Sequence, residues 1–220
     1  MNRKIKFGLI GASGRLGNEV KSVFIEQGHE LVFQFDADGE KKIDSPEILI
    51  DCSLPEVFPQ TITYASSFKA GLIIATTGLS INQFDELHTL SRKVPVVQSY
   101  NFSIGIQIML KLTEIAASKL NDWDVEIEET HHRFKKDKPS GTAKMIKEKL
   151  NKPDVNISSL RLGNVPGNHT VSFGGPGEVL SITHSATSRR TFAEGILKSA
   201  EFIMDKDIGF FTFTDILFQK

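Results

Sequence analysis

The sequence has few of the features that mark secreted, nucleic-acid-binding or membrane-spanning proteins. Its 220 residues include one cysteine, Cys52, which has no partner for an internal disulfide and so indicates a reducing compartment. Lys and Arg number 26 and Asp and Glu 27, so the net charge of -1 gives no reason to expect nucleic acid as a partner. No apolar run is long enough to cross a bilayer, and the N-terminus has no apolar stretch of the signal-peptide type. We therefore expect a cytoplasmic protein that binds neither nucleic acid nor membrane.

A glycine-rich turn follows the first apolar stretch of the chain. Lys4 to Ile10 is mostly apolar and predicts a buried strand, and a helical pattern starts at Leu16. Glycines between a strand and a helix let backbone N–H groups approach a pyrophosphate at the positive end of the helix. The next predicted strand ends in Asp36, about twenty residues on, where a carboxylate can accept the ribose hydroxyls of an adenosine. The dinucleotide contacts expected here are Gly11, Ala12, Ser13, Gly14, Arg15, Leu16 and Asp36.

Short apolar runs alternate with helical patterns through the rest of the first hundred residues. Strands are expected over residues 48–51, 71–75 and 94–97, with helices between them. Repeated β-α units of this kind predict a doubly wound parallel sheet, which binds ligands at the carboxyl ends of its strands. Thr76 to Gly78 and Ser99 to Phe102 follow two of these strands, so we expect them at the same edge as the glycine turn. The expected fold class is α/β, with a Rossmann-type N-terminal domain.

The pattern changes after Asn101. A long helix is expected from Ile104 to Leu120. Apolar and polar residues alternate near residues 124–128, 169–173 and 178–184, which predicts strands with one solvent-exposed face. These strands indicate a smaller α+β domain with a mostly antiparallel or mixed sheet. A helical pattern returns from Thr191. We expect a dinucleotide-binding domain of residues 1–101 and 192–220, and a second domain of residues 102–191, to which the family resemblance described below assigns substrate binding and tetramerisation.

The segment from Glu129 to Ala143 concentrates charge before an expected helix start. It contains His131 and His132, four Lys or Arg side chains and Asp137, followed by a Pro-Ser-Gly-Thr turn. Proton donors next to an anion-binding helix end indicate chemistry on a small, negatively charged substrate. A solvated charged loop is the alternative, and because adjacent histidines on a regular strand face opposite sides, one could be a packed or surface imidazole. A zinc site of His131, His132 and Asp137 lacks familiar ligand spacing, so no metal is expected.

Together these motifs resemble those of the 4-hydroxy-tetrahydrodipicolinate reductase family, also called dihydrodipicolinate reductases. The matching segments, which run over nearly the whole chain, are Gly11 to Gly17, Ala75 to Gly78, Asn101 to Gly105, Glu129 to Ala143, Gly177 to Glu178, Ile182 to His184 and Ser188 to Ala193. The resemblance implies an NADH- or NADPH-dependent reduction of 4-hydroxy-tetrahydrodipicolinate to tetrahydrodipicolinate with loss of water, in lysine biosynthesis by the diaminopimelate pathway. It also implies a small dicarboxylate substrate and a homotetramer assembled through the sheet of the second domain.

The resemblance implies roles for particular residues as well. His131 and Lys135 correspond to the family's acid/base pair. The substrate contacts carried over are His132, Ser140, Gly141 and Thr142, and the cofactor contacts, besides the glycine turn and Asp36, are Ala75, Thr76, Thr77, Ser99, Tyr100, Asn101 and Phe102. Hydride delivery builds electron density that a proton must quench, and Lys and His can supply protons near neutral pH when the site shifts their pKa values.

The chain departs from the family pattern at a few positions. Ala75 stands where glycine is usual, Phe134 where some relatives carry a further histidine, and Gln107 where asparagine is usual. Asp36 is followed by Ala37 and not by an arginine, so a 2′-phosphate would meet a carboxylate, and we expect NADH to be used at least as well as NADPH. The basic side chains that could partly offset this repulsion are Arg15, Lys41 and Lys42.

Two other classes of function stay open. A regulator that binds a dinucleotide and catalyses nothing would need only the first domain, but it gives the block around His131 no role. A different Rossmann-type dehydrogenase, such as one acting on an amino-acid semialdehyde, commonly uses a cysteine nucleophile, and Cys52 lies in the dinucleotide domain, away from that block. Arg189 is open too, since it could reach a substrate carboxylate or form a surface ion pair.

Overall fold

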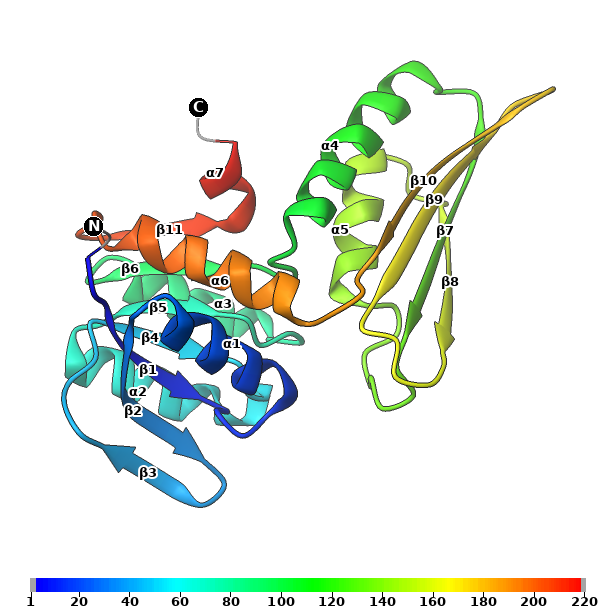
Figure 1. Ribbon diagram of the computed structural model, residues 1–220. Coiled ribbons are helices and arrows are strands. Elements are labelled where there is room, and N and C mark those ends of the chain that lie inside the picture. The colour runs from blue at the N-terminus through cyan, green and yellow to red at the C-terminus, as the bar shows by residue number, and fades with distance from the viewer. Residues whose placement is uncertain (1–2, 219–220) are drawn as a thin grey trace. The chain divides into compact units, whose positions relative to one another are not determined.

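The computed structural model describes residues 3–218, which form two compact units (Figure 1). The first unit contains the described residues up to Phe102 and those from Arg189 onward, and the second contains Ser103–Ser188. Within this part of the chain, no helix is both long and apolar enough to cross a membrane. The functional division expected from the sequence, with dinucleotide on one domain and substrate on the other, stays a prediction.

The first unit is built on a parallel sheet. Its strands, in spatial order, are β11 (Gly209–Thr212), β6 (Pro95–Gln98), β5 (Gly71–Ile74), β4 (Ile48–Asp51), β1 (Lys6–Ile10), β2 (Glu30–Asp36) and β3 (Gly39–Lys42). All neighbours pair in parallel except β3, which folds back antiparallel on β2. The order steps outward from β1 on both sides, which confirms the expected doubly wound α/β arrangement. The sequence pattern missed β3, because its four residues are all exposed and show no apolar alternation.

Helices cover both faces of this sheet. They are α1 (Arg15–Glu26), α2 (Phe58–Phe68), α3 (Ile81–Leu90), α6 (Arg190–Ile203) and the short α7 (Phe213–Leu217), with a 3-10 turn η1 (Pro55–Val57) before α2. Helix α1 packs beside α6, and their apolar side chains share one core with Phe7 and Leu9. Apolar side chains of α2 and α3 form the other core with Ile10 and Leu49. Cover on both faces explains why every residue of β4 and β5 is buried.

The second unit is a mixed sheet that packs against helices. Its strands, in spatial order, are β10 (Val179–Ser185), β9 (Asn168–Gly174), β7 (Asp124–His131) and β8 (Asn156–Arg161), and its helices are α4 (Ile104–Lys119) and α5 (Gly141–Leu150). Strand β8 runs parallel to β7, whereas β9 is antiparallel to both β7 and β10. The helices and the sheet share a core that includes Leu110, Ile146 and Phe173. The mixed sheet confirms the expected fold class, although the sequence pattern did not reveal β8.

Helix α4 carries apolar side chains on two faces. The stripe that stands out in the sequence, namely Ile104, Ile108, Leu112 and Ile115, is 45–60 % exposed. The buried residues are a neighbouring set, namely Ile106, Gln107, Met109, Leu110, Thr113 and Ala117. Periodicity alone cannot choose between the two sets, because residues of both recur every three to four positions.

Candidate active site

The turn between β1 and α1 has a shape that depends on glycine. Gly11 has φ +76°, and its N–H donates to the carbonyl of Phe35 at 2.9 Å. A Cβ on Gly17 would lie 2.1 Å from the Gly11 carbonyl oxygen, so a side chain there would push α1 away from the turn. The N-cap of α1 is Gly14, which has no side chain to cap the helix. The start of α1 is therefore not blocked by a capping side chain, as binding of a pyrophosphate requires.

Asp36 ends β2 at the rim of this turn. Its Oδ1 accepts hydrogen bonds from the N–H and the hydroxyl of Ser13, at 3.1 and 2.8 Å. The carboxylate is thereby held next to the glycine turn, where the ribose hydroxyls of a dinucleotide are bound in folds of this class. Lys42, which could have offset the charge of Asp36, has its Nζ 4.7 Å from the centre of the Phe68 ring instead.

A buried carboxylate fixes the ends of the next strands. Asp51, at the end of β4, is fully buried and accepts hydrogen bonds at 2.8 Å from the Ser53 N–H, the Thr61 hydroxyl and the Thr76 hydroxyl. Thr76 is thereby tied to β4, and β4 lies between β1 and β5 in the sheet. Sequence reasoning did not pick out Asp51 as a site residue, although a carboxylate ending an apolar run was the available signal.

The segment after β6 is also held in place. The Ser99 hydroxyl donates to the carbonyl of Asn101 at 2.8 Å and accepts from its N–H at 3.2 Å. Phe102 is buried, and a Cβ on Gly195 in α6 would lie 1.8 Å from the Phe102 carbonyl oxygen, so α6 packs directly on this segment. Because β6, β5, β4, β1 and β2 are parallel neighbours, the segments expected to bind cofactor all follow strands at one edge of the sheet.

Arg189, which precedes α6, feels the charge of Arg15 at the start of α1. Burial lowers the pKa of Arg189, and the positive charge of Arg15 lowers it further. The Nη2 atom of Arg189 is buried without a hydrogen-bond partner. A buried guanidinium nitrogen that feels a second positive charge favours a bound anion, so Arg189 joins the glycine turn as a candidate anion contact of the first unit.

The environment of Cys52 does not suit a catalytic nucleophile. Burial raises the pKa of its thiol, and the neighbouring Asp51 carboxylate raises it further. The thiolate is the reactive form of cysteine, so a thiol that stays protonated is a poor nucleophile. This weighs against a cysteine-dependent dehydrogenase.

Neighbouring strands of the second unit bring a carboxylate, two imidazoles and a guanidinium together. Glu129 and His131 are two residues apart on β7, so their side chains share a face, and Oε2 of Glu129 contacts Nδ1 of His131. Arg161, opposite His131 on β8, lies 3.0 Å from Oε1 of Glu129. His169, opposite Glu129 on β9, has its ring centre 5.1 Å from that of His131. We call these four residues the Glu129 cluster.

Two members of the Glu129 cluster have fixed charge near neutral pH. Burial opposes ionisation of Glu129, but hydrogen bonds from His131 and Arg161 outweigh it and hold the pKa of that carboxyl well below its usual range. Burial, reinforced by the charge of His131, lowers the pKa of His169 to about 3. Glu129 is therefore negative and His169 neutral under physiological conditions.

The two histidines of the charged block lie in different settings. His131 ends β7 and is only 6 % exposed, within the Glu129 cluster. His132 lies just beyond the strand and is half-buried, and its ring centre is 6.4 Å from that of the exposed Phe134. The structure therefore brings His131, and not His132, into the cluster.

Lys135 lies in the loop that follows β7. Its Nζ forms an ion pair with Asp137 at 2.8 Å, and the Lys135 side chain is 16 % exposed. The Lys135 N–H donates to the His132 carbonyl at 3.1 Å, and the Lys135 carbonyl accepts from Nε of Arg161 at 3.2 Å. Arg161 therefore fixes the loop that carries the second member of the expected acid/base pair.

Helix α5 begins directly after this loop. Ser140 is its N-cap: the Ser140 hydroxyl accepts from the N–H of Ala143 at 3.2 Å, and the Ser140 N–H donates to Oε1 of Glu129 at 3.3 Å. Gly141 and Thr142 form the first turn, the part of a helix that attracts carboxylates through its backbone N–H groups. The expected substrate contacts Ser140, Gly141 and Thr142 are thus joined to the cluster through Glu129.

Part of the cluster has the composition of a metal site. Glu129, His131 and His169 present ligand-type atoms that all lie within 4.8 Å of one another. The Glu129 carboxylate, however, already contacts the Arg161 guanidinium at 3.0 Å, which supplies the positive charge that a cation would bring. We assign no metal to these residues, and the expectation of a metal-free site stays a prediction.

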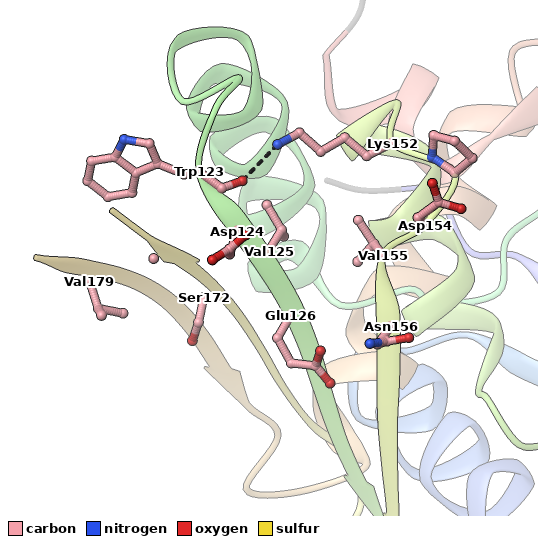
Figure 2. Close-up of a pocket in the computed structure, with 12 residues that line it drawn as sticks. Trp123, Asp124, Val125, Glu126, Lys152, Asp154, Val155, Asn156, Ser172 and Val179 are labelled. Atoms are coloured by element: carbon pink, nitrogen blue, oxygen red, sulfur yellow. Dashed lines mark hydrogen bonds between the residues drawn. The ribbon is translucent and has the colours of Figure 1, made fainter. Parts of the chain in front are cut away.

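A hollow of about 710 Å³ lies at the other end of β7 (Figure 2). The residues that line it include Trp123, Glu126, Asn156 and Val179. Lys152, also on its wall, donates to the Trp123 carbonyl at 2.9 Å. The length of β7 places this hollow roughly 20 Å from His131. It is therefore separate from the Glu129 cluster, and we assign no substrate to it.

Comparison with known proteins identifies the family. Two family models match the chain, dihydrodipicolinate reductase, N-terminus, over residues 5–102 and dihydrodipicolinate reductase, C-terminus, over residues 105–217. The 4-hydroxy-tetrahydrodipicolinate reductases of Thermosipho africanus and a Nitratiruptor species are 48 % and 32 % identical to the chain, over 97 % of its length and 98 % and 99 % of theirs. The dipicolinate-bound dihydrodipicolinate reductase of Paenisporosarcina sp. TG-14 has the same fold, with a TM-score of 0.74 at 22 % identity over 96 % of this chain and 98 % of that one. The chain therefore belongs to the dihydrodipicolinate reductase family.

Proposed function

We propose that the protein is an NAD(P)H-dependent oxidoreductase that reduces 4-hydroxy-tetrahydrodipicolinate to tetrahydrodipicolinate with loss of water, in the diaminopimelate pathway to lysine. Family membership over nearly the full chain supports the activity. The observation that carries the site proposal is the closeness of the Glu129 cluster, the Lys135 loop and the start of α5. This arrangement combines proton donors with an anion-binding helix end, as reduction of a dicarboxylate requires.

The proposed substrate site lies at the start of α5. Gly141 and Thr142 bind one carboxylate of a cyclic dicarboxylate through backbone N–H groups of the first turn, and His132 and Ser140 add side-chain contacts. Lys135 contributes positive charge close by. Dipicolinate, which is bound to the Paenisporosarcina relative, is a cyclic dicarboxylate and supports this class of ligand.

His131 and Lys135 are the proposed proton donors. The dehydrated substrate holds a C=N conjugated to a C=C, and a bound nicotinamide supplies the hydride. Electron density then builds on the substrate, and His131 and Lys135 lower its cost by their positive charge and quench it with a proton. The low exposure of both side chains, 8 % and 16 %, strengthens such electrostatic effects.

The proposed cofactor site lies at the carboxyl edge of the first unit's parallel sheet. Its contacts are Gly11, Ala12, Ser13, Gly14, Arg15, Leu16, Asp36, Ala75, Thr76, Thr77, Ser99, Tyr100, Asn101 and Phe102. The start of α1 receives the pyrophosphate, and Asp36 receives the ribose hydroxyls. Because Asp36 repels a 2′-phosphate, NADH is used at least as well as NADPH.

A homotetramer in the cytoplasm is the proposed working form. Exposed apolar side chains on the outer strands of the second unit's sheet support assembly through that sheet, among them Leu160, Val179 and Leu180, which are 45 %, 69 % and 43 % exposed. The free thiol of Cys52 is in keeping with a reducing compartment. Sedimentation equilibrium of the purified protein tests the oligomer, and a stable monomer would contradict it.

Turnover by the purified protein tests the proposed activity. Oxidation of NADH and NADPH is followed in parallel, with enzymatically generated 4-hydroxy-tetrahydrodipicolinate as the second substrate. Oxidation that depends on this substrate supports the proposal. Tight NADH binding without any turnover would instead identify a dinucleotide-binding regulator.

A further inference from the structure

We propose that Glu129 is a positioning residue for proton transfer: it binds the Nδ1–H of His131 and so makes Nε2 the nitrogen that exchanges a proton with substrate. The inference rests on the acid/base role proposed for His131. It adds to the reaction a residue that touches neither substrate nor cofactor and acts through the imidazole.

The geometry of β7 carries the first step. Glu129 and His131 lie on the same face of one strand, and the Glu129 carboxylate contacts Nδ1. An ionised carboxylate only accepts hydrogen bonds, so the nitrogen that faces it must carry a proton in both the neutral and the charged imidazole. Nε2 is therefore the nitrogen that can exchange a proton with substrate.

The surroundings of Nε2 carry the second step. A Cβ on Gly167 would lie 3.0 Å from Nε2 of His131, so the glycine leaves this nitrogen unobstructed on that side. Glu129 is in turn fixed by the Arg161 guanidinium at 3.0 Å and the Ser140 N–H at 3.3 Å. One buried carboxylate thus sets the direction of the imidazole and also holds the N-cap of α5, where the substrate carboxylate is proposed to bind.

Charged groups of both signs and neutral imidazoles surround His131. Glu129 is negative, whereas Arg161, which pairs with Glu129, and Lys135, which acts electrostatically on His169, are positive. His169, whose ring is edge-on to His131, is neutral, and burial lowers the pKa of His184 on β10 as well. Removing the charge of Glu129 leaves these positive groups without the carboxylate that balances them, so Glu129 is the negative group that the cluster needs.

A purely structural ion pair between Glu129 and Arg161 is the competing explanation. It predicts that loss of Glu129 weakens the fold and lowers activity by the same factor whether or not His131 is present. A positioning role predicts that Glu129 matters only while His131 is there to be positioned. The two explanations are therefore separated by a double-mutant cycle.

The experiment compares Glu129→Gln with Glu128→Gln as the matched control. Glu128 is the preceding residue on β7, is exposed and loses the same charge. For Glu129→Gln we expect kcat to fall at least roughly 10- to 100-fold, the size seen when a carboxylate that orients a metal-bound imidazole is removed. We also expect the dissociation constant for NADH to be unchanged. Glu128→Gln should match the native protein in all of these readouts.

The double variant Glu129→Gln/His131→Ala completes the cycle. If the double variant is no less active than His131→Ala alone, the positioning role is supported. If Glu129→Gln lowers activity by the same factor in the His131→Ala protein as in the native protein, the positioning role is overturned. The tautomer of His131, read from ¹⁵N–¹H couplings of its ring, gives a test that needs no turnover. We expect the neutral imidazole to carry its proton on Nδ1, and a neutral form protonated on Nε2 would overturn the proposal.

These readouts also separate this inference from the proposed function. If the native protein shows no reductase activity, the proposed function fails, and the tautomer still decides the claim about Glu129. If Glu129→Gln does not fold, Glu129→Asp retains the charge with a shorter reach. A kcat equal to that of the native protein would then overturn the claim that the position of the carboxylate matters.

Discussion

We expect Asp36 to disfavour NADPH relative to NADH, and replacing it with asparagine should remove that effect. NADPH differs from NADH by a 2′-phosphate that carries about two negative charges. With this phosphate about 5 Å from the Asp36 carboxylate and water-like screening, the repulsion is about 1 to 2 kcal/mol, or roughly tenfold in kcat/KM. Oδ1 of Asp36 accepts two hydrogen bonds from Ser13, so the carboxylate is held in place and cannot simply turn away.

The assay is the ratio of kcat/KM for NADH to that for NADPH. Asp36→Asn keeps an acceptor for Ser13 and should raise kcat/KM for NADPH roughly tenfold towards the value for NADH, with a smaller effect at high salt. The matched control is Asp38→Asn, which removes the same charge from an exposed position two residues on. A native preference for NADPH, or equal ratios in Asp36→Asn and Asp38→Asn, would refute the role given to Asp36.

Further predictions follow from other contacts. Gly17→Ala should lower the free energy of unfolding by roughly 1 to 3 kcal/mol and weaken NADH binding, because the new Cβ would lie 2.1 Å from the Gly11 carbonyl oxygen. Urea unfolding measures the stability and fluorescence titration measures the affinity for NADH. An unchanged stability and an unchanged affinity would contradict the prediction. Thr142→Val keeps its backbone N–H but loses its hydroxyl, so substrate KM should rise while kcat changes little, and the reverse result in steady-state kinetics would be evidence against a binding role. His169 has a pKa of about 3 when folded and near 6.5 when unfolded, so the unfolded state binds more protons between these values and stability falls as pH drops through that window. His169→Asn should reduce this loss of stability by up to about 1.4 kcal/mol per pH unit. Urea unfolding at several pH values checks this. If the free energy of unfolding depended on pH equally in the native protein and in His169→Asn, the burial of a neutral imidazole would be contradicted.

The fold was largely predictable because local patterns and tertiary structure agree in the first unit. Its strands are covered on both faces, so they read as short apolar runs, and the glycine turn follows the first of them. The elements that escaped prediction lack such patterns. Strand β3 is an exposed polar edge, and β8 alternates between exposed and half-buried residues without a fully buried one. The buried face of helix α4 could not be read from the sequence, since the helix also carries a regular apolar stripe that is exposed.

The candidate site was predictable only where its residues are adjacent in sequence. His131, Lys135 and Ser140 stand in one block, but Arg161 and His169 reach the cluster through strand pairing, which a single sequence does not display. Glu129 was visible as part of the block, and its two-residue spacing from His131 on an alternating strand was a signal that the side chains share a face. Its role needed the register of three strands and the contact to Arg161.

The most direct test of the central claim is the effect of His131→Ala and Lys135→Ala on reduction of 4-hydroxy-tetrahydrodipicolinate, measured together with the affinity for NADH. Both side chains lie in the second unit, whereas the glycine turn and Asp36 belong to the first. We predict that each substitution lowers kcat by roughly a hundredfold or more, because a proton source or a cation is lost as charge develops, while the dissociation constant for NADH stays the same. Near-normal kcat in both variants would contradict the proposed catalytic site, even in an active reductase.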